Sequence, residues 1–213
     1  MSFTKQESLV GSTLFATPEA TSAEVAAANL AFATADPVDD LPLKDENGSG
    51  TGTVAVAASG DQRIDGLLSA IRWSGSITYS APNSVSDYQA SHPEPFTDLQ
   101  QLSASQLAMV HAVLDTTIFN QPAGAYSYSV EGFTNLGIGY NGSGTGNATL
   151  RLVNTSDPGT AYAYYPSTQV YGGDVFFGPS GDLPVSGNYD AYTIIHEIGH
   201  ALGLKHGHET NDY

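Results

Sequence analysis

Hydrophobic residues recur with a helical period at two places in the middle of this chain. The first is residues 64–71, and the second begins after Ser103, whose capping-box partner is Gln106. The apolar stripe of the second segment consists of Leu107, Val110, Leu114 and Ile118. The spacing therefore predicts a short helix at the first place and a longer amphipathic helix at the second.

A third helical period lies near the end of the sequence. It predicts a helix from about Tyr189 to Leu202, with Asn188 as its N-cap. Gly203 stands where a residue in the left-handed conformation would end such a helix. The buried stripe is expected to be Ile195, Ile198 and Leu202.

One short segment before the second helix, and four between the second and the last, show the composition of β-strands, and turns rich in Gly and Asn separate the four. Leu150 and Leu152 are expected to share one face of a strand, and Pro166 suits the end of an edge strand. The predicted strands are 76–80, 126–130, 148–154, 161–166 and 173–178. The hexapeptide NGSGTG occurs at Asn47 and again at Asn141, and both copies are typical of turns.

The first 62 residues differ in pattern from the rest. Residues 21–37 suit one short helix that a proline ends, and the acidic and then Gly-rich stretch after it is typical of a linker. We expect residues 1–62 to be a leader or pro-like segment, largely flexible, and residues 63–213 to form the globular domain. A packed pro-segment is the alternative for the leader.

Charge and cysteine content exclude several functions. The 213 residues hold 6 Lys plus Arg against 22 Asp plus Glu, a net charge of −16. Such a surface repels phosphate backbones and anionic lipids, so we expect neither nucleic-acid nor membrane binding. The chain has no cysteine, so any metal must be bound through nitrogen and oxygen. No apolar signal peptide opens the sequence.

The stretch HEIGHALGLKHG contains three histidines at spacings that suit one metal ion. His196 and His200 lie four residues apart on the predicted last helix, so their side chains share one face, about 5–6 Å apart at Cβ. His206 would lie about 9 Å further along the axis if the helix continued. Because Gly203 lets the chain reverse, we expect His206 to return as the third zinc ligand.

Three neutral nitrogen ligands with an open fourth position are typical of a catalytic zinc site. Zinc lowers the pKa of a bound water to about 7, which makes hydroxide available at neutral pH. Glu197 follows His196 directly and is expected to act as the general base. The predicted reaction is attack of metal-activated water on an amide carbonyl.

This motif resembles the signature of the metzincin zinc endopeptidases, H-E-x-x-H-x-x-G-x-x-H. TIIHEIGHALGLKHGHE is most similar to the serralysin branch of secreted bacterial proteases, and IDGLLSAIRWSGSITYS is similar to the segment that opens their catalytic domain. The resemblance implies an α+β fold with a twisted, mixed five-stranded sheet, a long helix and a zinc-binding active-site helix. It also implies polypeptide substrates, a monomeric protein, and secretion without a signal peptide.

By the same resemblance, AYAYYP would be the antiparallel edge strand that binds an extended peptide through its backbone. Two pairs of residues could do so, Ala163 with Tyr165 or Tyr162 with Tyr164. Metzincins continue to a methionine-containing turn, which this sequence lacks after His206, so we expect a chain truncated before that turn, without its C-terminal subdomain. Ca²⁺ is possible in the full-length parent but not evident here.

The chain holds three further histidines, His92, His111 and His208. His208 is a rival third ligand, although the family spacing selects His206 and a solvated loop histidine is the simpler interpretation. His111 is expected either on the flank of the second helix or in the hydrophobic core of the protein, and His92 is expected in a loop. The alternative to an endopeptidase is a catalytically incomplete fragment or a non-catalytic module that binds zinc or peptide.

Overall fold

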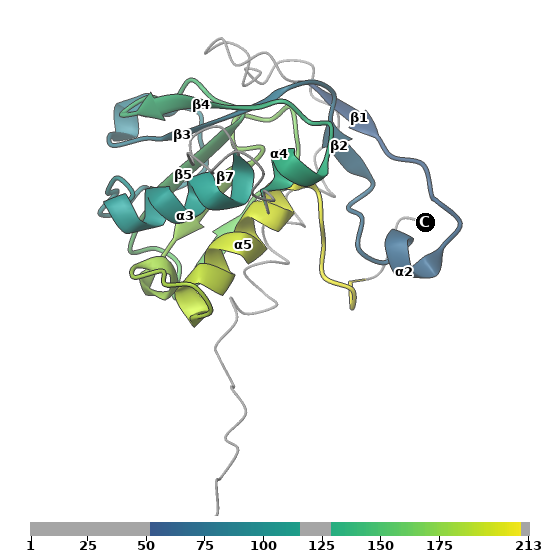
Figure 1. Cartoon of the computed structure of the whole chain (residues 1–213). Coiled ribbons are helices and arrows are strands. Elements are labelled where there is room, and N and C mark those ends of the chain that lie inside the picture. The colour runs from purple at the N-terminus through teal and green to yellow at the C-terminus, as the bar shows by residue number, and fades with distance from the viewer. Residues whose placement is uncertain (1–51, 116–128, 210–213) are drawn as a thin grey trace, which may run out of the picture.

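The computed structural model describes residues 52–115 and 129–209, and its centre is a mixed five-stranded sheet (Figure 1). The strand order is β4-β3-β5-β7-β6, and the edge strand β6 runs antiparallel to β7 while the other neighbours are parallel. The strands are β3 (Ile77–Ala81), β4 (Ile138–Ser143), β5 (Leu150–Asn154), β6 (Ala161–Ala163) and β7 (Asp174–Phe177). The predicted α+β class and mixed sheet are confirmed.

Two helices, α3 (Ala104–Leu114) and α5 (Tyr189–Leu202), lie side by side against one face of the sheet (Figure 1). Leu150 and Leu152 of β5 both enter the core between this face and the helices, as their alternation predicted. Each helix adds its own buried residues to this core: Val110 and Leu114 from α3, and Ile194, Ile198 and Ala201 from α5.

The opposite face of β5 and β7 is buried as well. The alternate side chains Val153 and Phe176 form a second small core with Tyr88. The long connection after β3 supplies this cover, and it begins with a single 3-10 turn over Val85–Asp87. Burial on both faces is usual for parallel strands, and here a loop takes the place that a helix often occupies.

Helices α3 and α5 begin and end where local sequence signals predicted. Ser103 and Gln106 form the capping box at the start of α3. The side chain of Asn188 accepts the backbone N–H of Ala191 and caps α5. The stripe predicted for α5 is wrong at Ile195, which is 48% exposed, because the face that meets the sheet is rotated by about one residue towards the neighbouring isoleucine.

The helix predicted over residues 64–71 is wrong for most of its length. Helix α2 covers only Gln62–Asp65, and Ile71–Trp73 forms strand β2. Ala70, between them, has a φ of 66°, which no right-handed helix allows. Strand β2 pairs antiparallel with β1 (Thr53–Ala55), which lies within the expected leader. Pairing with β1 therefore overrides the local helical spacing.

Two other predictions near β4 are also wrong. Val130–Phe133 forms the short helix α4, so the predicted strand 126–130 does not extend to its last residue. The second NGSGTG copy does not begin with a turn, since Asn141 lies inside β4.

A single 3-10 turn, Pro179–Gly181, precedes α5. The helix predicted at 21–37, the first NGSGTG copy, Ile118 and residues 126–128 lie outside the described residues. Within the described ranges, no helix has the length and apolar character needed to cross a bilayer.

Candidate metal centre

Helix α5 places two of the three predicted zinc ligands on one face. The Nε2 atoms of His196 and His200 are 3.1 Å apart, as the four-residue spacing allows. Glu197 lies between them in sequence and is 7% exposed. The burial of this helix against the sheet therefore leaves both imidazoles directed at the same point.

A tight chain reversal after α5 brings in the third histidine. Gly203 has a φ of 106°, its N–H donates to His200 O at 2.9 Å, and Leu204 N donates to Gly199 O at 2.9 Å. A Cβ on this glycine would lie 2.7 Å from the backbone oxygen of Ile71. Glycine is thus required here both for its left-handed conformation and for close packing against β2.

The returning segment is fixed by backbone pairing with the beginning of the domain. Ser69 N donates to Gly203 O at 3.0 Å, and Lys205 N donates to Leu67 O at 2.8 Å. The indole N–H of Trp73 donates to Ala201 O at 2.9 Å and holds the last turn of α5. Residues 67–73 therefore fix the position of the loop that carries the third histidine.

The three Nε2 atoms converge in a nearly equilateral triangle. His206 Nε2 lies 3.0 Å from His196 Nε2 and 3.2 Å from His200 Nε2. Nitrogen ligands at about 2.0–2.1 Å from a tetrahedral ion stand roughly 3.3 Å apart, so the triangle fits a zinc ion. These three residues are the group with metal-binding geometry among the described parts of the chain.

The partners of the Nδ1 atoms determine the tautomers of two rings. His200 Nδ1 lies 2.7 Å from Leu204 O and His206 Nδ1 lies 2.6 Å from Glu209 Oε1, and both oxygens accept hydrogen bonds. Each Nδ1 therefore carries a proton, and Nε2 is the nitrogen that each ring directs at the other histidines. Burial lowers the pKa of His200 to about 4, which keeps that ring neutral. A metal ion between these Nε2 atoms, which are 3.2 Å apart, would be bound by both rings.

Glu197 is a buried carboxylate on the same helix as His196 and His200. Burial raises its pKa to about 8. Among the residues that the structure describes, none donates a hydrogen bond to its carboxylate. A nearby cation favours the ionised form of a carboxyl group, so a bound metal would oppose the effect of burial.

Strand β6 is an edge strand, as predicted for AYAYYP, and the hydrogen bonds around it show which backbone groups face outwards. Tyr164 N donates to Asp174 O at 2.9 Å, and Thr160 O accepts a backbone bond at 2.7 Å from the residue after β7. Hydrogen-bonded positions alternate in an antiparallel pair, so Tyr162 also faces β7. The backbone of Ala163 consequently faces away from the sheet.

This alternation shows which of the two predicted residue pairs has backbone groups available to a peptide. The Tyr162 and Tyr164 backbones are directed towards β7, so they are not offered to a new strand. Ala163 remains, although the carbonyl of its companion Tyr165 is partly engaged by Gly173 N at 3.3 Å. Peptide binding at this edge stays a prediction, with Ala163 as its centre.

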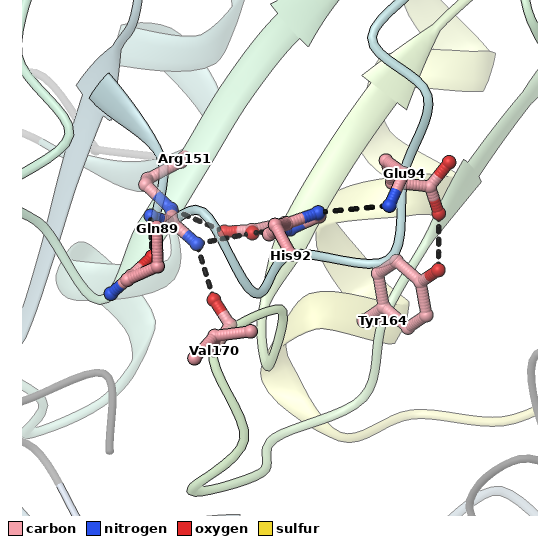
Figure 2. A network of polar contacts seen from close by, with 7 residues as sticks. Gln89, His92, Glu94, Arg151, Tyr164 and Val170 are labelled. Atoms are coloured by element: carbon pink, nitrogen blue, oxygen red, sulfur yellow. Dashed lines mark hydrogen bonds and ion pairs between the residues drawn. The ribbon is translucent and has the colours of Figure 1, made fainter. Parts of the chain in front are cut away.

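A buried polar network lies behind β6 and β7 (Figure 2). Arg151 donates to both carboxylate oxygens of Asp174, at 2.8 and 2.6 Å, and His92 Nε2 lies 2.9 Å from the same carboxylate. Further along, the hydroxyl of Tyr164 donates to Glu94. The network therefore connects the loop after β3 with β7 through Asp174 and with the end of β6 through Tyr164.

The remaining histidines have different surroundings. His208 is exposed and stacks on the ring of His206, with centroids 5.2 Å apart, outside the triangle. His92 lies in a loop, as predicted, but its side chain is buried against Asp174. His111 is buried on α3 and its Nδ1 contacts the hydroxyl of Tyr79 at 2.5 Å. None of these three lies within the converging group.

Sequence reasoning missed the side chain of Glu209 and the carbonyl of Leu204, which hold the ligand rings. A carboxylate three residues after a histidine is too common a spacing to be a signal by itself. The contact becomes visible when the turn after Gly203 folds Glu209 against His206.

Comparison with known protein families agrees with this geometry. Residues 67–207 match the family described as metallo-peptidase family M12B, reprolysin-like. The fold and the site define a metzincin-type metallopeptidase domain, as the resemblance implied. Within that class, the chain belongs to the reprolysin-like metallo-peptidase family M12B.

A curated relative is similar over a shorter stretch. Serralysin from Proteus mirabilis is 42% identical over 59 residues, which cover 24% of this chain. The match spans 12% of the length of that relative. The similarity supports the same class of protease.

Proposed function

We propose that this chain is a zinc-dependent endopeptidase domain that hydrolyses internal peptide bonds. The observation that carries the proposal is the convergence of three histidine Nε2 atoms at 3.0–3.2 Å, with Nδ1–H of His200 and His206 already committed to oxygen acceptors. A metal ion at the centre of this triangle would accept a lone pair from each Nε2 atom. A bound Zn²⁺ would supply a water of lowered pKa and a Lewis acid for the scissile carbonyl.

The residues of the chain have separate roles in this proposal. His196, His200 and His206 hold the ion, and Glu197 accepts a proton from the attacking water and delivers it to the leaving amine. An extended peptide adds to the outer edge of β6, where Ala163 offers its backbone N–H and C=O. Secretion, which the serralysin resemblance implies, and a monomeric state are parts of the same proposal.

The test compares peptide hydrolysis and zinc content in matched variants. The unmodified chain is expected to bind one Zn²⁺ and to cleave casein, and a chelator should abolish cleavage. Glu197→Ala should keep the zinc and lose activity by about 10²–10⁴-fold, because general base catalysis is removed. His206→Ala should lose the zinc, whereas the control His208→Ala, in the same loop, should keep both zinc and activity.

The outcomes also separate the proposal from its alternative. One bound zinc with casein hydrolysis that Glu197→Ala does not change would contradict the assigned role of Glu197. Zinc binding without any hydrolysis would favour a non-catalytic zinc- or peptide-binding module. A chain that takes up no zinc at all would refute the metal centre.

A further inference from the structure

The carboxylate of Glu209 lies where the third-histidine loop meets the end of the edge strand. Its Oε1 is 2.6 Å from His206 Nδ1, and its Oε2 accepts the hydroxyl of Tyr165 at 3.2 Å. The backbone of Glu209 is held too, since its N–H donates to His206 O at 3.1 Å and Lys205 Nζ donates to its carbonyl at 3.0 Å. Both carboxylate oxygens are therefore engaged by neighbouring elements.

We propose that Glu209 and Tyr165 are positioning residues that orient His206 for metal binding, an inference that rests on the proposed zinc site. The carboxylate accepts a hydrogen bond from Nδ1–H of His206. The proton therefore stays on Nδ1, and Nε2 keeps its lone pair for a metal. A charged acceptor at this nitrogen also makes the opposite nitrogen a stronger donor to a metal. Tyr165 prevents the carboxylate from rotating away, because it holds the second oxygen.

His206 needs such support more than a ligand within a helix does. It lies in the loop beyond Gly203, and its side chain is 22% exposed. His200 is fixed by the helix backbone and by the carbonyl of Leu204. A loop imidazole without a partner at Nδ1 is free to rotate, which moves Nε2 out of the triangle, and to exchange tautomers, which puts the proton on Nε2.

Tyr165 also connects the metal ligands with the proposed peptide-binding edge. It follows β6 by two residues, and its ring meets His200 edge-on, with centroids 5.6 Å apart at 90°. Its hydroxyl reaches Glu209 from the side of the strand. The structure thus holds the end of the edge strand and the third ligand against each other through one tyrosine.

The experiment measures the zinc affinity of the full chain by competition with a chromophoric chelator, with Zn²⁺ as the probe. Glu209→Ala is expected to weaken zinc binding by about 10–100-fold, the usual effect of losing a carboxylate behind a histidine ligand. Glu209→Gln should fall between Glu209→Ala and the unmodified chain, because an amide oxygen can still accept from Nδ1 without the charge. Tyr165→Phe should weaken binding by a few fold.

His208→Ala is the matched control, since it removes an exposed imidazole from the same loop and should leave the affinity unchanged. Visible spectra of the Co²⁺-loaded proteins provide a second measurement, and the Glu209→Ala spectrum should differ from that of the unmodified chain. A Glu209→Ala affinity within twofold of the unmodified chain, with an unchanged Co²⁺ spectrum, overturns the proposal. Failure of the unmodified chain itself to bind zinc would instead refute the metal centre and, with it, this inference.

Discussion

Two clusters in this protein place a histidine against other polar groups, and they are built on opposite principles. In the buried network, the Arg151 guanidinium faces both oxygens of Asp174, and His92 contacts the same carboxylate (Figure 2). Glu94 N donates to His92 Nδ1 at 3.2 Å, so the proton of that ring is on Nε2 and is donated to Asp174. The donor atoms of Arg151 and His92 meet acceptors there.

The triangle of His196, His200 and His206 instead brings three Nε2 atoms together around one point. The protons of His200 and His206 are directed outwards to Leu204 O and Glu209, and lone pairs are left inside. The difference shows how a structural histidine can be told from a metal ligand. The decisive feature is the group that the second ring nitrogen faces, whereas proximity to a carboxylate is common to both clusters.

The largest expected effect is on stability, from breaking the buried ion pair. Side chains of Arg151 and Asp174 are both fully buried, so Arg151→Met leaves an uncompensated charge and should lower the free energy of unfolding by about 3–5 kcal/mol. Urea unfolding of the zinc-free proteins measures the loss. The double variant with Asp174→Asn should recover part of it, and an unchanged midpoint for Arg151→Met would mean that the pair is not a structural element.

The second expected effect is that Zn²⁺ stabilises the folded protein, and that this stabilisation requires the histidine triangle. With free Zn²⁺ at about 100 times its Kd, unfolding should cost about 2.7 kcal/mol more than in chelator. His196→Ala should lose this increment while its stability in chelator stays close to that of the unmodified chain. Thermal scans with and without Zn²⁺ measure both, and an equal zinc increment in His196→Ala would show that the ion binds elsewhere.

The sequence predicted the triangle well because its geometry is mostly local. The bounds of α5, the cap at Asn188 and the reversal at Gly203 follow from rules that act over a few residues. Once these are in place, the three histidines have little freedom. The signal is strong because a glycine at the reversal and a third histidine beyond it are needed together.

The buried network could not be predicted because it is assembled from distant segments. His92 and Asp174 come together only when the loop after β3 covers the sheet, and nothing near either residue indicates that contact. The helix predicted at residues 64–71 failed for a related reason. Its apolar spacing is real, but Ala70 adopts a positive φ and the next residues pair with β1, a partner that the local pattern does not contain.

The third expected effect comes from Gly203→Ala, which should lower both the stability of the fold and its affinity for zinc. The added Cβ would lie 2.7 Å from Ile71 O, and a φ of 106° is strained for alanine, so we expect a loss of about 1–3 kcal/mol. Zinc affinity should fall as well, because the same turn delivers His206. Gly199→Ala is the matched control within α5, where a Cβ meets only Leu204 Cδ1 at 3.8 Å. Equal effects of the two substitutions would contradict the role given to the reversal.

The smallest expected effect concerns His111, which is neither a metal ligand nor an ion-pair partner. Burial lowers its pKa, and Asp115 opposes this only in part. Burial also raises the pKa of the Tyr79 hydroxyl, which lies 2.5 Å from Nδ1 of His111. The folded protein thus keeps this ring neutral at a pH where the unfolded chain, with a pKa of about 6.5, already binds a proton.

The sign of the pH dependence follows from that difference. Because the unfolded state binds more protons, His111 contributes stability above about pH 6.5 that is lost as the pH falls towards its lower folded pKa. Urea unfolding between pH 7.5 and 5.5, in chelator so that zinc release does not intervene, should show a shallower decline for His111→Gln than for the unmodified chain. His196, His200 and His206 are the same in both proteins, so their contribution cancels in the comparison. A decline of equal slope would show that burial does not lower the pKa of this imidazole in the folded protein.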